Sequence, residues 1–291
     1  EPAFLGREAH LVMIGIVGLG LIGGSLGLAL RGEEVLGYSR RPETVASALR
    51  IGAITRGTRE LKEVTQAEVI IVATPISGVK EILAELSPHL RRGSLVMDTA
   101  STKAQVMAWA EALLPPGVDF IGGHPMAGKE SWGLEAATSD LFQGASFCLV
   151  PSSRASSGAV TRAVALAEKV GARPLFLKAE EHDFLVAGIS HLPLLISAAL
   201  VQVTSTDPAW EQMAKLAAGG FRDVTRLASG NPEMARDICI TNAGPLAQWL
   251  KKFGQKLEEI GQNLEDSDRI KRVFSQSRQS REDWLKERNW K

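Results

Sequence analysis

Cysteine is scarce in this sequence, since the 291 residues include only Cys148 and Cys239. Two cysteines in a chain of this length do not form a disulfide framework, and neither a Cys-x-x-Cys pair nor the Cys/His spacing of a zinc site is present. Free cysteine behaves as a small apolar residue, so we expect two buried, reduced thiols and no metal. Reduced thiols are typical of a reducing compartment, and we expect the chain to be cytoplasmic.

An excess of charge is also missing, because 33 Lys and Arg residues balance 33 Asp and Glu residues. This balance argues against the broad basic surface of a nucleic-acid-binding protein. Long apolar runs are absent too. The most apolar stretch, Leu192–Val203, is about half the length that spans a bilayer, and the mixed residues Glu1–His10 do not resemble a signal peptide. We therefore expect no nucleic-acid partner and no membrane segment.

The remaining composition is typical of a globular protein, with 45% hydrophobic and 23% charged residues. In the first half of the chain, short apolar runs alternate with helical patterns. This alternation predicts βαβ units and a parallel sheet with right-handed crossovers. The predicted strands are Leu11–Val17, Val35–Ser39, Val69–Thr74, Ser94–Thr99, Phe120–Gly123, Ser146–Val150 and Arg173–Leu177.

Beyond about residue 178 the pattern is helical almost to the end of the chain. We predict an α/β fold, with a Rossmann-type dinucleotide-binding domain at residues 1–178 and an all-helical domain for substrate binding and dimerisation at residues 179–291. The segment Leu185–Val203 is apolar nearly all round, so this helix must be buried on every side. The helical domain is too small to bury it alone, and we expect a homodimer. The charged tail, Leu264–Lys291, is predicted to be a surface helix that frays at its end.

The segment Gly18–Gly23 has the pattern Gly-x-Gly-x-x-Gly directly after an apolar strand and before a helix, which is the context of a dinucleotide-binding loop. Gly18 permits the tight turn, Gly20 lets the backbone approach a pyrophosphate, and Gly23 lets helix and strand pack closely. The N–H groups of the helix N-terminus would bind the phosphates. The predicted cofactor contacts in this loop are Gly18, Leu19, Gly20, Leu21, Ile22 and Gly23.

The end of the second predicted strand distinguishes the two nicotinamide dinucleotides. An NAD site places Asp or Glu here to bind the ribose 2′-hydroxyl. This chain has Ser39, followed by Arg40 and Arg41, and a guanidinium binds a phosphate through charge-assisted hydrogen bonds. The three residues favour NADP as cofactor. Use of both dinucleotides, or two solvated arginines at the start of a helix, are the alternatives.

Three predicted strands end in polar residues, at Thr74–Ile76, Asp98–Ser101 and Gly122–Pro125. Ligands of open α/β sheets bind beyond the carboxyl ends of the strands, so we expect these ends to meet near the nicotinamide ring. His124 is the natural general base, because the pKa of a free imidazole lies near neutral pH. Ser101 could bind the substrate or orient this imidazole. The expected cofactor contacts in these strand ends are Thr74, Pro75, Ile76 and Ser101.

The helical half contains a second polar set. Ser190–Pro193 interrupts the apolar helix, and a buried polar residue such as His191 needs a partner, which a substrate could supply. A satisfied core histidine is the alternative. Gly219-Gly220 are expected to form a turn before a helix that carries Arg222 and Arg226. We expect one of these arginines to pair with a neighbouring acid and the other to bind a substrate carboxylate.

Together these residues resemble the prephenate/arogenate dehydrogenase family of tyrosine biosynthesis. The matching blocks are GLGLIGGSLG (18–27), ATPI (73–76), DTASTK (98–103), GGHPMAGKESWG (122–133), EEHD with SHLP (180–193) and GGFRDVTRLASGNPEM (219–234). The resemblance implies a reaction that residue spacing cannot give. A cyclohexadienol with a 4-hydroxyl and a ring carboxylate transfers hydride from C4 to the nicotinamide and loses carbon dioxide from C1, and its ring becomes aromatic.

The same resemblance implies roles for individual residues. His124 would accept the proton of the 4-hydroxyl, and Ser101 would support that hydroxyl. Arg226 would bind the ring carboxylate, and His191 would line the pocket near the substrate side chain. The helical domain of the family forms an intertwined dimer. Further candidate substrate contacts are Arg222 and Gly128.

Within the family, the chain is most similar to the cyanobacterial and plant-type arogenate enzymes, for which NADP is the usual partner. Arogenate has an ammonium group where prephenate has a keto group. A cation prefers nearby carboxylates, and Glu180, Glu181 and Asp183 stand shortly before His191. The expected activity is therefore the NADP-dependent conversion of arogenate to tyrosine. The alternative is a prephenate dehydrogenase that uses NAD or NADP.

Two other classes of protein fit the residues less well. A sensor that binds NADP without chemistry would not need a hydroxyl, an imidazole and a guanidinium beside a substrate pocket. A β-hydroxyacid dehydrogenase or ketol-type reductase usually requires a lysine or a metal-binding acid cluster in its helical domain. Lys215 alone is poor support for such an enzyme.

Overall fold

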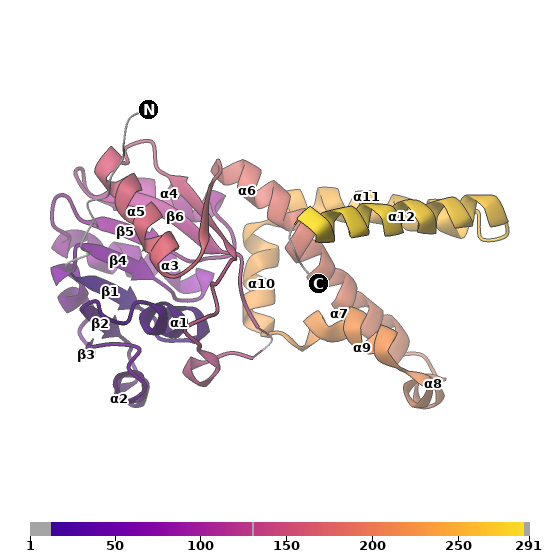
Figure 1. Cartoon of the computed structure of the whole chain (residues 1–291), viewed down its shortest axis with the longest axis horizontal. Coiled ribbons are helices and arrows are strands. Elements are labelled where there is room, and N and C mark those ends of the chain that lie inside the picture. Colours follow the sequence, from indigo (N-terminus) through magenta and orange to yellow (C-terminus); the bar gives the residue numbers. More distant parts are fainter. Residues whose placement is uncertain (1–12, 130, 288–291) are drawn as a thin grey trace. The chain divides into compact units, whose positions relative to one another are not determined.

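The computed structural model describes residues 13–129 and 131–287 and contains an eight-stranded sheet followed by helices (Figure 1). All seven predicted strands are present within a few residues, although Leu11 and Val12 of the first prediction lie outside the described residues. The strands are β1 (Ile14–Val17), β2 (Val35–Tyr38), β3 (Arg56–Thr58), β4 (Val69–Val72), β5 (Leu95–Asp98), β6 (Asp119–Pro125), β7 (Ser146–Pro151) and β8 (Arg173–Phe176).

The strand order in the sheet is β3-β2-β1-β4-β5-β6-β7-β8. Neighbouring strands are parallel, as expected, except that β7 runs antiparallel to β6. A parallel connection needs a long crossover, usually a helix. Between β6 and β7 the only helical element among the described residues is the short 3₁₀ turn η3 (Leu134–Ala136), so the chain returns in the opposite direction. The prediction of an entirely parallel sheet was therefore wrong at this one pair.

The edge strand β3 was not predicted from the sequence. Its three residues, Arg-Gly-Thr, lack an apolar run, and two of them are exposed. It pairs with β2 only, at the end of the sheet. Short, polar edge strands of this kind carry little hydrophobic pattern, so the sequence does not reveal them.

Helices cover both faces of the sheet, as alternating strands and helices require. On one face, apolar residues of α1 (Leu21–Ala29), α2 (Pro42–Arg50) and α5 (Ser157–Lys169) pack on the sheet. On the other face, α3 (Ile76–Leu86) and α4 (Ala104–Leu113) do so. All four residues of β4 are buried, as the uninterrupted β-branched run predicted. The fold is thus the expected α/β layer structure, in which each central strand leads through a loop into the next helix.

After β8 the described residues form only helices and loops, beginning with α6 (Ala179–Val186). The chain divides into two compact units, Glu1–Ala243 and Gly244–Lys291. The first unit therefore includes the first helices after the sheet, and the domain boundary that we place at residue 178 stays a prediction. The remaining helices of this unit are α7 (Leu192–Ser205), α8 (Trp210–Leu216), α9 (Gly219–Thr225) and α10 (Pro232–Thr241).

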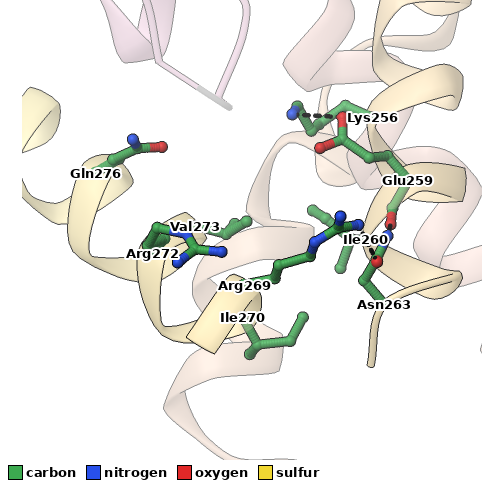
Figure 2. Close-up of a pocket in the computed structure, with 9 residues that line it drawn as sticks. All are labelled: Lys256, Glu259, Ile260, Asn263, Arg269, Ile270, Arg272, Val273 and Gln276. Atoms are coloured by element: carbon green, nitrogen blue, oxygen red, sulfur yellow. Dashed lines mark hydrogen bonds and ion pairs between the residues drawn. The ribbon is translucent and has the colours of Figure 1, made fainter. Parts of the chain in front are cut away.

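The second unit is a pair of helices, α11 (Ala243–Gly261) and α12 (Ser267–Glu287). No described residue of α12 is buried, in agreement with the predicted surface helix, and the end of that prediction lies outside the described residues. This unit contains a hollow of about 390 Å³, whose lining residues are drawn in Figure 2 and include no predicted site residue. Its lining residues are Lys256, Glu259, Ile260, Asn263, Arg269, Ile270, Arg272, Val273 and Gln276.

The apolar helix of the first unit is longer than the sequence suggested. α6, the π-helical turn η4 (Ala187–His191) and α7 form one continuous helix of 27 residues, Ala179–Ser205. By length and composition this helix could cross a membrane, although the core helix of a globular protein passes the same test, and 28% of its most apolar window is buried. Ser190–Pro193 does not break the helix. Instead, the π turn precedes Pro193, which has no N–H to donate.

Two carboxylates on the helices of the first unit bind the N-termini of helices that follow the central strands. Asp183 of α6 accepts hydrogen bonds from the backbone N–H groups of Lys103 (2.7 Å) and Ala104 (2.9 Å) at the start of α4. Asp237 of α10 accepts one from the N–H of Ser77 (3.1 Å) at the start of α3. Free N–H groups and the helix dipole make such N-termini good sites for a negative charge. These contacts attach α6 and α10 to the loops at the carboxyl ends of β4 and β5.

Candidate active site

The glycine loop lies at the point where the strand order reverses, between β1 and β4. Gly18 has a φ of +98°, a conformation that other residues rarely adopt. A Cβ at Gly23 would lie 1.9 Å from the carbonyl oxygen of Gly18, so only glycine lets α1 pack this closely on the loop. A Cβ at Gly20, by contrast, would meet nothing within 4 Å. The N-terminus of α1 therefore has open space beside it, which fits a pyrophosphate group.

The end of β4 adds a second feature that fits a dinucleotide. The hydroxyl oxygen of Thr74 is buried and has no hydrogen-bond partner among the described residues. A buried hydroxyl without a partner is unfavourable, so a bound ligand that supplies one is favoured. Thr74, Pro75 and Ile76 follow β4 directly, and Ile76 begins α3. The predicted cofactor residues of this segment thus lie at the same strand-order reversal as the glycine loop.

The end of β2 has no carboxylate before α2 begins. Ser39 accepts a hydrogen bond from the backbone N–H of Arg41 (3.2 Å), and this turn leads into Pro42, the first residue of α2. Arg40 and Arg41 are both exposed. Their guanidinium groups are therefore accessible to a phosphate at the N-terminus of α2. The same exposure fits two solvated arginines, so the geometry leaves both interpretations open.

His124 is buried near the carboxyl end of β6 and is hydrogen-bonded to a second histidine. Its Nδ1 lies 2.9 Å from Nε2 of His182 on α6, and Nδ1 of His182 lies 2.8 Å from Oδ1 of Asp183. The carboxylate can only accept, so in its neutral form His182 donates to it through Nδ1–H and accepts at Nε2. His124 must then donate through Nδ1–H. This chain of bonds leaves the lone pair of His124 Nε2 as the proton acceptor.

The surroundings of His124 also favour its neutral form. Burial lowers the pKa of His124 well below 6.5, and the neighbouring His182, Lys103 and His191 lower it further. A neutral imidazole with a free Nε2 lone pair has the chemistry of a general base at neutral pH. His124 is therefore a buried imidazole near the carboxyl end of β6, and the residue hydrogen-bonded to its ring is His182.

His191 lies in the π turn η4 and is also buried. The side-chain nitrogen of Asn242 donates to the backbone oxygen of Asp183 (2.8 Å) and to Nδ1 of His191 (3.1 Å). Nδ1 therefore accepts, and the proton of neutral His191 is on Nε2, which has no hydrogen-bond partner in the part of the chain that the structure describes. Burial lowers the pKa of His191 to about 4, partly offset by Asp183. His191 is thus a buried N–H donor that a ligand oxygen would satisfy.

The other predicted site residues are spread over several loops. Ser101 is half-buried in the segment between β5 and α4. Arg226 is exposed at the start of the 3₁₀ turn η5 (Arg226–Ser229), which packs against α7. Arg222 pairs with Asp223 (3.0 Å), the arrangement expected for one of the two arginines. Gly128 is exposed after β6. The structure brings His124 and His191 into one cluster with His182.

Two expectations about the helical half need correction. Gly219-Gly220 are the first residues of α9 rather than a turn that precedes a helix. Asp183 was expected to be a possible partner for a substrate ammonium group, but its carboxylate is already bonded to two backbone N–H groups and to His182. Glu180 and Glu181 are exposed on α6. The structure therefore assigns Asp183 to the support of the histidines.

The sequence did not reveal His182, Lys103 and Asn242 as members of this cluster. His182 and Lys103 stand within the polar blocks EEHD and DTASTK, so no apolar surroundings in the sequence marked them as buried. Both cysteines are free thiols, with Cys148 buried and Cys239 half-buried. Within residues 13–129 and 131–287, no group of three or more His, Cys, Asp or Glu side chains could hold a metal ion.

A sheet with a glycine loop at its strand-order reversal defines a dinucleotide-binding protein of the Rossmann type. The chain belongs to the prephenate dehydrogenase family: residues 24–176 match the family's nucleotide-binding domain, and residues 178–276 match its dimerization domain. The resemblance seen in the sequence is confirmed.

Individual relatives agree with this placement. The prephenate dehydrogenase of Bacillus subtilis is 34% identical, over 92% of this chain and 74% of its own. The crystal structure of Synechocystis arogenate dehydrogenase superposes with a TM-score of 0.81 at 31% identity, covering 94% of this chain and 100% of its own. The Aquifex aeolicus prephenate dehydrogenase, in complex with hydroxyphenyl propionate and NAD+, gives a TM-score of 0.87 at 27% identity, covering 97% and 99%.

The neutral, buried histidines predict that the protein loses stability in mild acid. In the unfolded chain a histidine has a pKa near 6.5, whereas folding lowers the pKa of His191 to about 4 and that of His124 well below 6.5. The unfolded state therefore binds more protons as the pH falls below 6.5. The free energy of unfolding should decrease by about 1.4 kcal/mol per pH unit for each ring in this window, and these rings should contribute no pH dependence above it.

Urea unfolding between pH 7.5 and pH 4.5 measures this effect. His191→Gln, which cannot titrate, should show a shallower pH dependence than the wild type. His89→Gln is the matched control, because His89 is outside the cluster and its loss should leave the slope unchanged. Equal slopes in wild type and His191→Gln would contradict the neutral state of His191.

Proposed function

We propose that this chain catalyses the NADP-dependent oxidative decarboxylation of arogenate to tyrosine. Membership of the prephenate dehydrogenase family supports the coarser statement, that it is a prephenate/arogenate dehydrogenase of tyrosine biosynthesis with a nicotinamide dinucleotide cofactor. The observation that carries the proposal is the direction of the hydrogen bonds that join Asp183, His182 and His124, which leaves Nε2 of His124 free to accept a proton. A protein that only sensed NADP would have no use for this base.

The residues act on a cyclohexadienol as follows. Nε2 of His124 accepts the proton of the 4-hydroxyl, and the positive charge that develops on the ring is stabilised through His182 by the Asp183 carboxylate. A bound nicotinamide would accept the hydride that leaves C4 of the cyclohexadienol. Loss of carbon dioxide from C1 then makes the ring aromatic. Ser101 supports the hydroxyl, and Arg226 binds the ring carboxylate, which is the best-matched partner of a guanidinium.

The choice between the two substrates and the two dinucleotides rests on separate observations. Arg40 and Arg41, together with the absence of a carboxylate at the end of β2, support NADP. The likeness to Synechocystis arogenate dehydrogenase supports arogenate. The N–H donor of His191 supports prephenate as the second candidate, because this donor matches a keto oxygen better than an ammonium group. The Bacillus subtilis relative is named a prephenate dehydrogenase.

Replacing His124 tests the proposed base. Asparagine is similar in size and can form hydrogen bonds but cannot accept the proton, so kcat of His124→Asn should fall by roughly 10² or more. NADP affinity should stay near that of the wild type. Arg226→Ala should instead raise KM more than it lowers kcat, because a carboxylate contact is made in the ground state as well. If His124→Asn keeps more than about a tenth of kcat, with chemistry rate-limiting, His124 is not the base.

A four-way rate comparison, with arogenate or prephenate and NADP or NAD, tests the substrate and the cofactor together. We expect the highest kcat/KM for arogenate with NADP. Arg40→Ala should weaken NADP binding by about 1.5–3 kcal/mol, the contribution of a charged hydrogen bond, and leave NAD binding nearly unchanged. Arg50→Ala, an exposed arginine at the other end of α2, is the matched control. Equal losses for both dinucleotides with Arg40→Ala would contradict the assignment to a 2′-phosphate.

We further propose that the dimerization domain assembles a homodimer through the exposed apolar face of the long helix. Ile189 and Val203 on this helix are 73% and 72% exposed, and Ile240 on α10 is 68% exposed. Apolar side chains this exposed are typical of a subunit interface when several lie on one helical domain. A second copy of this chain is the expected partner, because residues 178–276 match a dimerization domain.

Light scattering at micromolar concentration should show a dimer. Val203→Asp introduces a charge into the proposed interface and should shift the chain to the monomer, since an unpaired buried charge is costly. Leu49→Asp, at an exposed position of α2, should leave the dimer intact. A fully active monomer at this concentration would overturn the proposal.

A further inference from the structure

The strand that carries His124 extends beyond its partner. β5 ends at Asp98, and its pairing with β6 ends at Met97 opposite Ile121. β6 continues to Pro125 and pairs with β7 over these last residues. On the side that faced β5, the backbone of Gly123 therefore has no strand to bond to. Unpaired backbone groups in a buried strand are unfavourable, so their partners have to come from elsewhere.

A buried ion pair supplies these partners. Oδ1 of Asp98 accepts the N–H of Gly123 (3.1 Å), and Nζ of Lys103 donates to the carbonyl oxygen of Gly123 (2.6 Å). Lys103 and Asp98 also bond directly to each other, and both side chains are fully buried. The pair thus continues the hydrogen-bond pattern of the sheet by one residue, at the peptide unit immediately before His124.

The same lysine also supports the imidazole ring of His124. Its backbone N–H donates to Oδ1 of Asp183 (2.7 Å), the oxygen that accepts from His182. His182 in turn fixes Nδ1 of His124. Lys103 is therefore linked to His124 indirectly by two routes. Its side chain holds the backbone of Gly123, and its backbone N–H, which any residue at this position would supply, binds the carboxylate that orients the ring through His182.

A purely stabilising role does not explain this arrangement. Removing two charges from water costs several kcal/mol per ion, and buried ion pairs are often no more stabilising than apolar residues of similar size. A buried lysine is rarely found without a specific use. Gly123 adds to the constraint, because a Cβ there would lie 2.4 Å from the backbone oxygen of Asp98. Asp98, Lys103 and Gly123 together allow only one arrangement of the backbone at this end of β6.

We propose that Lys103, paired with Asp98, is the positioning residue of His124, and that it fixes both the backbone and the ring of the base for proton transfer. The inference rests on the proposed function, in which His124 is that base. The titratable and charged groups that face His124 are His182, His191 and Lys103. The positive charge of Lys103 also disfavours a protonated imidazole, so it favours the neutral form of His124 that can accept a proton.

The test compares two variants with the wild-type protein. Lys103→Met removes the cation and the donor but leaves Asp98 buried without its partner. Asp98→Asn combined with Lys103→Met removes both charges, so no carboxylate is left buried without its cation. It replaces one of the two oxygens that accept from Gly123 and Ala100 with an amide nitrogen, and it does not restore the donor to Gly123. Lys169→Met, which removes a lysine from an exposed ion pair with Glu33, is the matched control and should behave as the wild type.

Lys103→Met should lower kcat roughly 10- to 100-fold, the effect of misplacing a catalytic group by about 1 Å, with KM for NADP nearly unchanged. Removing a nearby cation raises the pKa of His124, so the acid limb of the kcat/KM profile should move to higher pH. The double variant should regain thermal stability and keep the low kcat. Wild-type kcat in the double variant would overturn the inference, because Lys103 would then serve only to neutralise Asp98. An unchanged kcat and pH profile in Lys103→Met would do the same.

Nuclear magnetic resonance of ¹⁵N-labelled histidine separates this inference from the proposed function. If Lys103 positions His124, the ring nitrogens of His124 shift in Lys103→Met, whatever reaction the enzyme catalyses. A shifted ring together with a fully active His124→Asn would retain the positioning role and refute His124 as the base. An unshifted ring would refute the positioning role itself.

Discussion

The site depends on the hydrogen bonds that the Asp183 carboxylate accepts. It binds two backbone N–H groups at the start of α4 and the ring of His182, all with distances of 2.7 to 2.9 Å. α4 has no capping side chain of its own, so a residue from α6 performs that function. The bonds to Asp183 therefore join a helix of the helical half to the loop after β5, and at the same time set the protonation pattern of two histidines.

Several consequences follow from this one acceptor. Because a carboxylate cannot donate, a neutral His182 donates to Asp183 and accepts from His124, which gives the direction of each hydrogen bond in the chain. Asn242 bonds to the backbone oxygen of the same residue and thereby determines the tautomer of His191. The two histidines then offer opposite chemistry to a ligand, with an acceptor at His124 and a donor at His191. A substrate with a hydroxyl at one end and oxygen acceptors at the other matches this pair.

The sequence revealed those parts of the molecule that depend on local pattern. The glycine loop, the buried run Val69–Val72 and the histidine after β6 were all visible, because a tight turn, a doubly buried strand and a polar strand end each require particular residues. The direction of β7 was not visible, since it depends on the length and structure of the connection. His182 and Lys103 were missed because their roles arise from partners 58 and 20 residues away. No local pattern records such contacts.

The helical half was harder to interpret for a related reason. An apolar pattern indicates that a helix is present but not whether it is continuous. Pro193 suggested that the helix is interrupted, whereas the π turn before it lets the helix continue. The arginines of α9 and η5 are exposed in the single chain, so the residues alone could not say which of them meets a ligand. The choice between the arginines depends on the ligand, which the sequence pattern does not contain.

The π turn η4 also decides on which side of the helix His191 lies. His182 and His191 are nine residues apart, and at about 100° per residue an uninterrupted α-helix would place them on nearly opposite sides. The wider π turn rotates the chain less per residue, which brings His191 back toward the side of His182 by roughly a quarter of a turn. The helix thus changes phase once along its length. An inserted or deleted residue between His182 and His191 would change the angle between the two histidines by about 100° while leaving the composition of the helix almost the same.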